Sequence, residues 1–167
     1  MNLRPCTDAD LAPMLALNNA HATELGPLTL ESLRRLLGMA MHVRIAGAMD
    51  GFLVALDESA PYDSPNFLWF KARFARFAYI DRVVIAESVR GRGLARRLYE
   101  DLFRSASAHT HVFCEVNYDP PNPASEAFHI AMGFSEVGRA TLADRGKSVR
   151  YLSRALSRCQ TCWSRIT

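Results

Sequence analysis

Two glycines interrupt the middle of this 167-residue chain and separate a strand-like segment from a helical one. Residues 79–85 have the β-branched content of a buried strand, and apolar side chains recur every four residues over 94–106, as in an amphipathic helix. Between them, the small residues of 90–95 let backbone N–H groups approach a ligand closely, and a helix N-terminus attracts anions. Two arginines add positive charge there. This strand, turn and helix predict a pyrophosphate site.

Two common nucleotide-binding motifs do not fit the turn, whose sequence is Arg90-Gly91-Arg92-Gly93-Leu94-Ala95. The complete phosphate-loop pattern GxxxxGK[ST] does not occur in the chain. The dinucleotide pattern GxGxxG/A needs a small residue where Arg96 stands. A turn before a surface helix with exposed arginines is the plain alternative if the turn is considered alone.

Composition sets broad limits on the class of protein. Hydrophobic residues make up 49% and charged residues 22%, which is ordinary for a globular chain and argues against disorder. Lys and Arg number 20 against 17 Asp and Glu, so the net charge is only +3. Lys71 and Lys147 are the only lysines, and arginine suits bidentate contacts to phosphate. The balance argues against a strongly basic coat, and we expect no nucleic-acid partner.

The length predicts a single domain over residues 1–153, with 154–167 as a C-terminal tail. No apolar run approaches the ~20 residues that cross a bilayer, and the N-terminus does not resemble a signal peptide. We therefore expect a cytoplasmic protein without a membrane partner. Cys114 lies in an apolar run and predicts a buried thiol. Cys159 and Cys162 form one CxxC pair without a second pair, so we expect no metal site.

Periodicity and turn residues predict a mixed α/β chain. Helices are expected after the capping residues near positions 7 and 29, over 94–106 and over 124–132. Residues 59–67, rich in Pro, Ser and Asp, are expected to form a loop that leads into aromatic residues. The expected strands are residues 2–4, 43–46, 52–56, 79–85, 111–116, 134–141 and 147–152.

Two motifs in the second half of the chain resemble one family in pattern and spacing. Arg90, Gly93 and Ala95 match Gln/Arg-x-x-Gly-x-Gly/Ala, and residues 122–134 are similar to Asn-x-x-Ala followed by Leu-Tyr and Gly-Phe. Both are typical of the GNAT superfamily of acyl-CoA-dependent N-acyltransferases. The resemblance covers about residues 3–153. It implies a mixed α+β fold with a central, mainly antiparallel, splayed sheet of about seven strands flanked by helices.

The resemblance also implies where acetyl-CoA binds. The strands at 79–85 and 111–116 would diverge. The pantetheine arm would then pair with the free edge of the strand at 79–85, because an unpaired strand edge offers hydrogen-bond donors and acceptors. The pyrophosphate would rest on the amides of the turn. The cofactor-binding residues implied are Val83, Val84, Ile85, Arg90, Gly91, Arg92, Gly93, Leu94, Ala95, Asn122, Ser125 and Phe128.

The family reaction is direct attack of an amine on the thioester, in a ternary complex. A tyrosine commonly protonates the leaving thiolate, but His129 stands at that position here. Imidazole suits acid–base work near neutral pH, and a packing role for His129 stays open beside it. Tyr99 and Tyr118 are weaker candidates for the acid. Asp81 and Glu115 are the candidate bases, with pairing to Arg82 or to a backbone donor as their alternative roles.

The acceptor is expected to be an amine on a small molecule or a peptide. Aromatic residues over 67–77, with Asp57, Glu58 and Asp63 nearby, favour a cationic and partly apolar amine, although a core role for the aromatic residues is an alternative. A non-catalytic acyl-CoA-binding regulator is the rival function, because the usual tyrosine is missing. The resemblance also implies a possible homodimer.

Overall fold

The computed structural model describes residues 2–142 and 146–156. The chain contains both helices and strands, with two single turns of 3₁₀ helix at Asp8–Asp10 and Glu87–Val89. The helices are α1 (Leu11–Ala20), α2 (Ala22–Leu25), α3 (Leu30–Met39), α4 (Pro65–Lys71), α5 (Leu94–Ser105) and α6 (Pro123–Ala131). The strands are β1 (Leu3–Arg4), β2 (His42–Ala46), β3 (Gly51–Asp57), β4 (Phe77–Ile85), β5 (His111–Asp119), β6 (Ser135–Leu142) and β7 (Lys147–Ala155).

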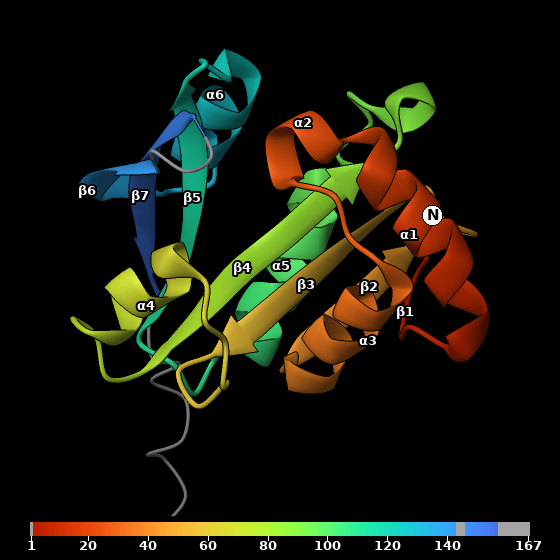
Figure 1. The fold of residues 1–167 in the computed structure, drawn as a ribbon, viewed down its shortest axis with the longest axis horizontal. Helices are drawn as coiled ribbons and strands as arrows, with labels where there is room; N and C mark the ends of the chain where they lie inside the picture. The colour runs from red at the N-terminus through yellow and green to blue at the C-terminus, as the bar shows by residue number, and fades with distance from the viewer. Residues whose placement is uncertain (1, 143–145, 157–167) are drawn as a thin grey trace, which may run out of the picture.

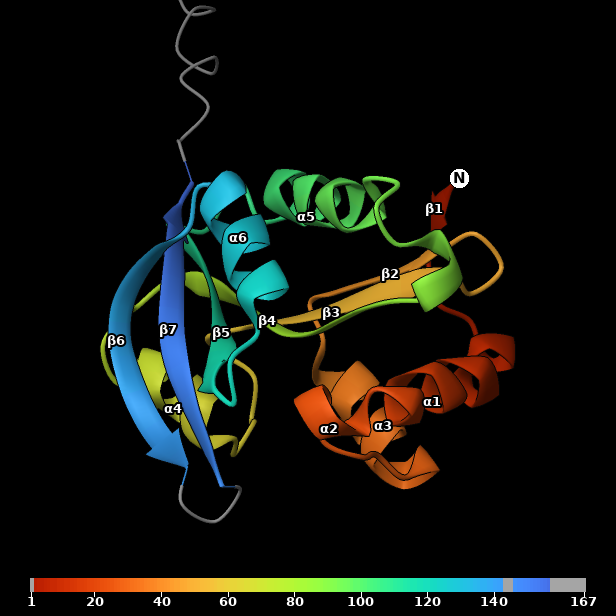
Figure 2. The same cartoon turned by 90° about the horizontal axis from the view of Figure 1, so that it is seen from above.

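The described strands form one seven-stranded sheet in the order β1-β2-β3-β4-β5-β7-β6. Every neighbouring pair is antiparallel except β4 and β5, which run parallel. The predicted mixed α/β class and the mainly antiparallel sheet are therefore confirmed. Figure 2 shows α5 on one face of the limb built from β2, β3 and β4, and α1, α2 and α3 on the opposite face.

The two limbs of the sheet diverge between β4 and β5 (Figure 1). The parallel ladder joins only Phe77–Tyr79 to His111–Phe113. Just beyond it, the register between β3 and β4 shifts, so that Asp81 is an extra residue on β4. Such a bulge bends its strand and re-aims the following side chains. The β5-facing edge of β4 after Tyr79 therefore has no strand partner among the described residues.

The apolar core lies on both faces of the sheet. One cluster joins α1, α3 and α4 to the sheet, and the other packs α5 against it. Phe67 and Phe70 are fully buried in the first cluster, and Phe70 stacks on Phe113 with ring centroids 4.5 Å apart. Cys114 is buried with a free thiol, as predicted. Cys159 and Cys162 lie outside the described residues.

The expected loop over residues 59–67 is wrong at its C-terminal end, because α4 begins at Pro65. Proline at the first helical position has no N–H to leave unsatisfied, and Phe67 and Phe70, three residues apart, then face inward together. These rings form core, as the alternative interpretation held, and line neither of the two cavities described below. Asp57, Glu58 and Asp63 also line neither.

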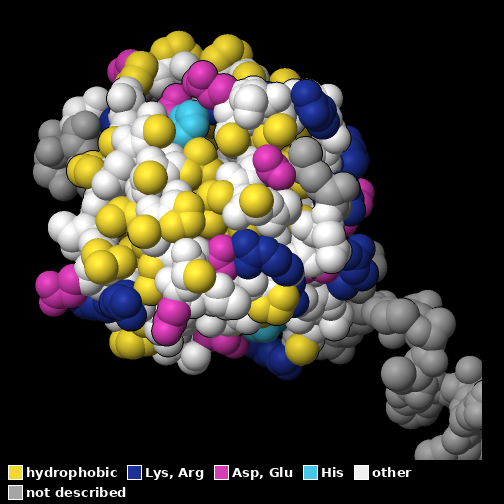
Figure 3. All heavy atoms as spheres, turned by 90° about the vertical axis from the view of Figure 1, so that its right-hand side faces the viewer, with side chains coloured by type: hydrophobic (Ala, Val, Ile, Leu, Met, Phe, Trp, Pro, Cys, Tyr) yellow, Lys and Arg dark blue, Asp and Glu magenta, His cyan; other side chains and the backbone are white. Residues whose placement is uncertain are grey.

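The surface shows mixed charge on the face that Figure 3 presents, where acidic and basic side chains are interspersed among apolar ones. That face shows no large patch of only basic or only acidic side chains. Within the described ranges, no helix combines the length and the apolar character needed to cross a bilayer.

Gly51 fixes the approach of β3 to the part of β4 that borders the site. A Cβ atom at this position would lie 2.6 Å from the Val84 carbonyl oxygen, which is backbone and can move only with its strand. We predict that Gly51→Ala costs about 1–3 kcal/mol of the free energy of unfolding, the usual cost of overpacking. Denaturant titration measures it.

Gly38 in α3 provides the matched control, because an added Cβ meets nothing within 4 Å there. Gly38→Ala should leave stability unchanged or raise it by up to about 1 kcal/mol, since alanine favours helix. Equal effects of the two substitutions would contradict the close packing of β3 on β4.

Candidate active site

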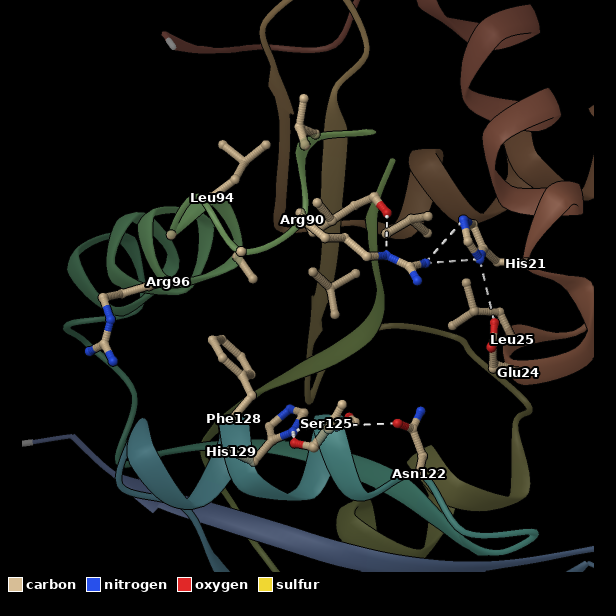
Figure 4. A pocket seen from close by; sticks show the side chains of 18 residues that line it. His21, Glu24, Leu25, Arg90, Leu94, Arg96, Asn122, Ser125, Phe128 and His129 are labelled. Carbon is tan, nitrogen blue, oxygen red and sulfur yellow. Dashed lines mark hydrogen bonds and ion pairs between the residues drawn. The ribbon is translucent and has the colours of Figure 1, made fainter. Parts of the chain in front are cut away.

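A cavity of about 560 Å³ lies between β4, the start of α5 and α6 (Figure 4). We call it the turn cavity. Every residue predicted to bind the cofactor lines it except Arg92, which is exposed and lies outside the lining. His21, Glu24, Leu25, Val89, Arg96 and Ala124 also line it, and His129 completes the wall. The first three come from the end of α1 and from α2, which no local motif linked to the turn.

The turn presents free backbone donors to this cavity. Gly91 and Gly93 have φ angles of 75° and 74°, in the left-handed region that glycine adopts without strain. The first backbone hydrogen bond of α5 runs from the Arg97 N–H to the Gly93 carbonyl, at 3.2 Å. The N–H groups of the first α5 turn therefore have no helical acceptor, and they carry the positive end of the helix dipole. This geometry suits an anion.

Arg90 crosses the mouth of the turn cavity. Its Nε donates to the Ile85 carbonyl at 3.2 Å, and its Nη2 lies 3.3 Å from Nδ1 of His21. In Figure 4 the guanidinium extends from the end of β4 toward His21. No motif in the sequence links His21 to the turn, and only the fold brings it here.

Side chains from α6 form the opposite wall. The Asn122 side-chain oxygen accepts from the Ser125 N–H at 3.2 Å, which caps the helix. In Figure 4, Phe128, His129 and Ser125 extend from α6 toward the interior. Asn122 and Ser125 line both this cavity and a second one, so the two cavities meet at α6.

Two hydrogen bonds orient the His129 ring, and burial favours its neutral form. Its Nδ1 lies 2.7 Å from the Ser125 carbonyl oxygen, which can only accept, so Nδ1 carries the proton. Nε2 then accepts from the Tyr99 hydroxyl at 2.8 Å. The side chain is 4% exposed, and this burial lowers the pKa of His129 below its usual value. Burial likewise raises the pKa of Tyr99 well above 10.

The second cavity, of about 580 Å³, contains Glu115, and we call it the Glu115 cavity. The Glu115 carboxylate accepts from the Tyr79 hydroxyl at 2.8 Å and from the Asn66 amide at 2.9 Å. Tyr151 in turn donates to the Asn66 side-chain oxygen at 3.0 Å. Burial raises the pKa of Glu115 to about 7, and the charge of Asp81 adds to the shift. Sequence analysis predicted none of these partners.

Asp81 does not line either cavity. Its Oδ2 lies 2.9 Å from Nε of Arg82, which is the pairing that the alternative interpretation predicted. Asp81 also raises the pKa of Tyr62, after the larger effect of burial. As the extra residue of the β4 bulge, Asp81 has its carboxylate held by these neighbours. Glu115 is therefore the carboxylate of the pair that reaches a cavity.

The sequence matches the Acetyltransferase (GNAT) family over residues 15–134. That match covers most of the chain, and together with the two motifs it shows that the protein belongs to the GNAT acetyltransferase family. A search of curated proteins found no match.

Solved structures share the fold over nearly the whole chain. The ribosomal-protein-S18-alanine N-acetyltransferase from Escherichia coli superposes with a TM-score of 0.66 and 15% identity, covering 93% of this chain and 94% of that one. Naa20 from Chaetomium thermophilum, in complex with a bisubstrate analogue, gives 0.72 and 20%, covering 95% and 88%. A chain of the NatC complex, bound to Gag peptide and CoA, gives 0.70 and 17%, covering 93% and 98%.

Glu115 should make stability depend on pH. Its folded-state pKa of about 7 lies above the ordinary value of 4.5, so the folded state binds the extra proton between these values. Stability contributed by this group therefore falls as pH rises from about 4.5 to above 7, by up to about 3 kcal/mol. We predict that Glu115→Gln removes this part of the pH dependence.

Denaturant titrations of both proteins at pH 5 and pH 8 measure the difference. Between pH 5 and pH 8, the original protein should lose more free energy of unfolding than Glu115→Gln does. The variant should therefore be more stable relative to the original protein at pH 8 than at pH 5. A difference in stability between the two proteins that is the same at both pH values would contradict the raised pKa.

Proposed function

We propose that this protein is an N-acetyltransferase that transfers the acetyl group of acetyl-CoA to a primary amine in a ternary complex. The observation that carries the proposal is the meeting of the two cavities at Asn122 and Ser125. One cavity offers an anion site at the turn and an unpaired strand edge, and the other holds a carboxyl group with a raised pKa.

The turn cavity receives the donor. Its pyrophosphate rests on the free amides of the α5 N-terminus, with Arg90 beside them. The pantetheine amides pair with the open edge of β4 at residues 83–85, in the manner of an added strand. The thioester then lies near the junction of the cavities, where an N–H on the open edge of β4, near Val84, stabilises the oxyanion. CoA bound in the similar NatC structure supports this choice of donor.

The acceptor amine enters through the Glu115 cavity. Glu115, directly or through a water, takes a proton from the ammonium group, and the free amine attacks the thioester carbonyl carbon. A C–N bond forms and the C–S bond breaks as the tetrahedral intermediate collapses. The nitrogen loses its second proton to water in that step, and water delivers a proton to the departing sulfur. The products are the acetylated amine and CoA.

Direct transfer needs no covalent acyl-enzyme. No cysteine lines either cavity among the described residues, and Cys114 is buried with its thiol pKa raised well above the usual value by burial. We assign His129 to holding the cavity wall rather than to donating a proton, because its one ring proton is already bonded to the Ser125 carbonyl.

The turn glycines provide a direct test of donor binding. Gly93→Val places a β-branched residue at a positive φ and should rotate the amides away from the pyrophosphate. We predict a fall in CoA affinity of about tenfold or more, the value of one hydrogen bond to a charged group. Calorimetric titration with CoA measures it.

Gly146 offers the matched control, since it also has a positive φ and open space for a Cβ, but lines neither cavity. Gly146→Val should bind CoA as the original protein does. Unchanged CoA affinity in Gly93→Val, with the fold intact, would contradict the proposed donor site.

Glu115→Gln tests the base. A base works only when deprotonated, so kcat/KM should rise with pH through about 7 in the original protein. The variant should lose this rise in kcat/KM but keep the rise that comes from deprotonation of the amine itself. Its kcat should be lower by about 100-fold or more. CoA-release assays between pH 5.5 and 9 measure both.

His129→Gln is the comparison variant for the base. It should retain the pH profile of the original protein, because a neutral imidazole contributes no titration to it. Loss of turnover in this variant at every pH, with CoA still bound, would assign the proton donor to His129 after all. CoA binding by the original protein without turnover of any amine would favour the rival function, a non-catalytic acyl-CoA-binding regulator.

A further inference from the structure

Two basic side chains line the Glu115 cavity with hydrogen-bond donors left over, and we infer from them that the acceptor is an amine that also bears a carboxylate. Free amino acids are the simplest members of this class. The inference rests on the proposed function, because it names the kind of amine that the same site acetylates.

Arg82 is the first of these donors. It is 9% exposed, and its Nε pairs with Asp81 while its Nη1 donates to the Asn18 side chain at 2.8 Å. These contacts fix the plane of the guanidinium. These contacts, with a further one from Nη1 to the Gly26 carbonyl at 3.4 Å, involve Nε and Nη1, and Nη2 forms the other end of the fork. Because Arg82 lines the Glu115 cavity, this end of the fork offers two N–H donors to an occupant.

Lys147 is the second donor, from the start of β7. Its Nζ donates to the carbonyl oxygens of Thr23 and, at 3.1 Å, Glu24. Both acceptors are uncharged backbone groups, and no carboxylate of the described residues pairs with this ammonium. An ammonium has three N–H donors, so one remains for the cavity that Lys147 lines.

Of these two cations, Arg82 is paired with Asp81, whereas no carboxylate of the described residues pairs with Lys147. Glu24 is an exposed side chain that lies 3.5 Å from the His21 ring. Glu115 is half neutral near pH 7, because burial raises its pKa to about that value. Asp81 pairs with Arg82 from outside the cavity lining. The acidic residues once expected to attract a simple cation, Asp57, Glu58 and Asp63, lie elsewhere.

An amine with a carboxylate matches this arrangement at both ends. Its nitrogen lies at Glu115 next to the junction with the turn cavity, and its carboxylate accepts from Arg82 and Lys147. An amine without the carboxylate would leave Lys147 without a charged acceptor among the described residues. The carboxylate therefore determines specificity rather than chemistry.

The test compares matched amines on the full-length protein with acetyl-CoA. Each L-amino acid is assayed beside its α-carboxamide and its decarboxylated amine, with CoA release as the rate and calorimetry of the CoA complex as the binding measurement. We expect at least one amino acid to exceed its amide by about tenfold or more in kcat/KM, the difference that a charge-assisted hydrogen bond makes. The preference should lie mainly in KM.

Lys147→Gln should raise the KM for the acid by about tenfold more than the KM for the amide, so that the preference shrinks. Lys71→Gln is the matched control, because Lys71 also donates to a backbone carbonyl, at 3.2 Å from Ala60 oxygen, but lies outside both cavities. The comparison of amines on the original protein decides the question even if Lys147→Gln does not fold.

Amides or decarboxylated amines that react as well as the acids would overturn the inference and leave the proposed function standing. Binding of CoA with neither binding nor turnover of any carboxylate-bearing amine would overturn it as well. Failure of the original protein to bind CoA at all is a different result, and it would overturn the proposed function itself.

Discussion

The short parallel ladder between β4 and β5 is the constraint on which the rest of the site depends. Three residues of each strand pair, and an extra residue at Asp81 then bends β4 away. A closed sheet would satisfy the edge of β4 with β5. The divergence instead leaves that edge open, and the two cavities share the lining residues Asn122 and Ser125 at the start of α6. The anion site and the Glu115 carboxyl therefore reach a common junction.

The opening between the limbs is stabilised by contacts on either side of it. Aromatic packing of Phe70 on Phe113 holds the closed end of the sheet together. Across the gap, Asn117 and Lys147 from the β5–β7 limb donate to backbone carbonyls of the α2 region, and Arg82 from β4 holds α1 through Asn18. The segment around α2 is thus attached to both limbs. It forms a wall that the two cavities share through Glu24 and Leu25.

Local pattern predicted the features that depend on local chemistry. The turn at 90–95 was predicted with its helix, because glycine conformation and the helical period are properties of neighbouring residues. The cap at Asn122 and the buried Cys114 follow the same logic. In contrast, α4 was missed because seven residues with two inward-facing rings give a weak periodic signal beside a Pro- and Ser-rich loop.

The environment of Glu115 could not be predicted, because its partners Asn66, Tyr79 and Tyr151 come from three separate elements. The same holds for Tyr99, which donates to His129 from another helix, and for His21 beside Arg90. Asp81 and Glu115 looked equivalent in sequence as acids on diverging strands. The fold distinguishes them, because Glu115 lines a cavity whereas Asp81, the extra residue of the bulge, pairs with Arg82 outside both cavities.

Amide hydrogen exchange on β4 tests the central claim most directly, because an unpaired strand edge exchanges and a paired one is protected. The account predicts that adding CoA slows exchange of the unpaired amides within residues 83–85 and at the start of α5, while residues 77–79, already paired with β5, do not change. Slowed exchange confined to other elements, or none on β4 in a protein that binds CoA, would contradict the claim that the open edge of β4 receives the donor.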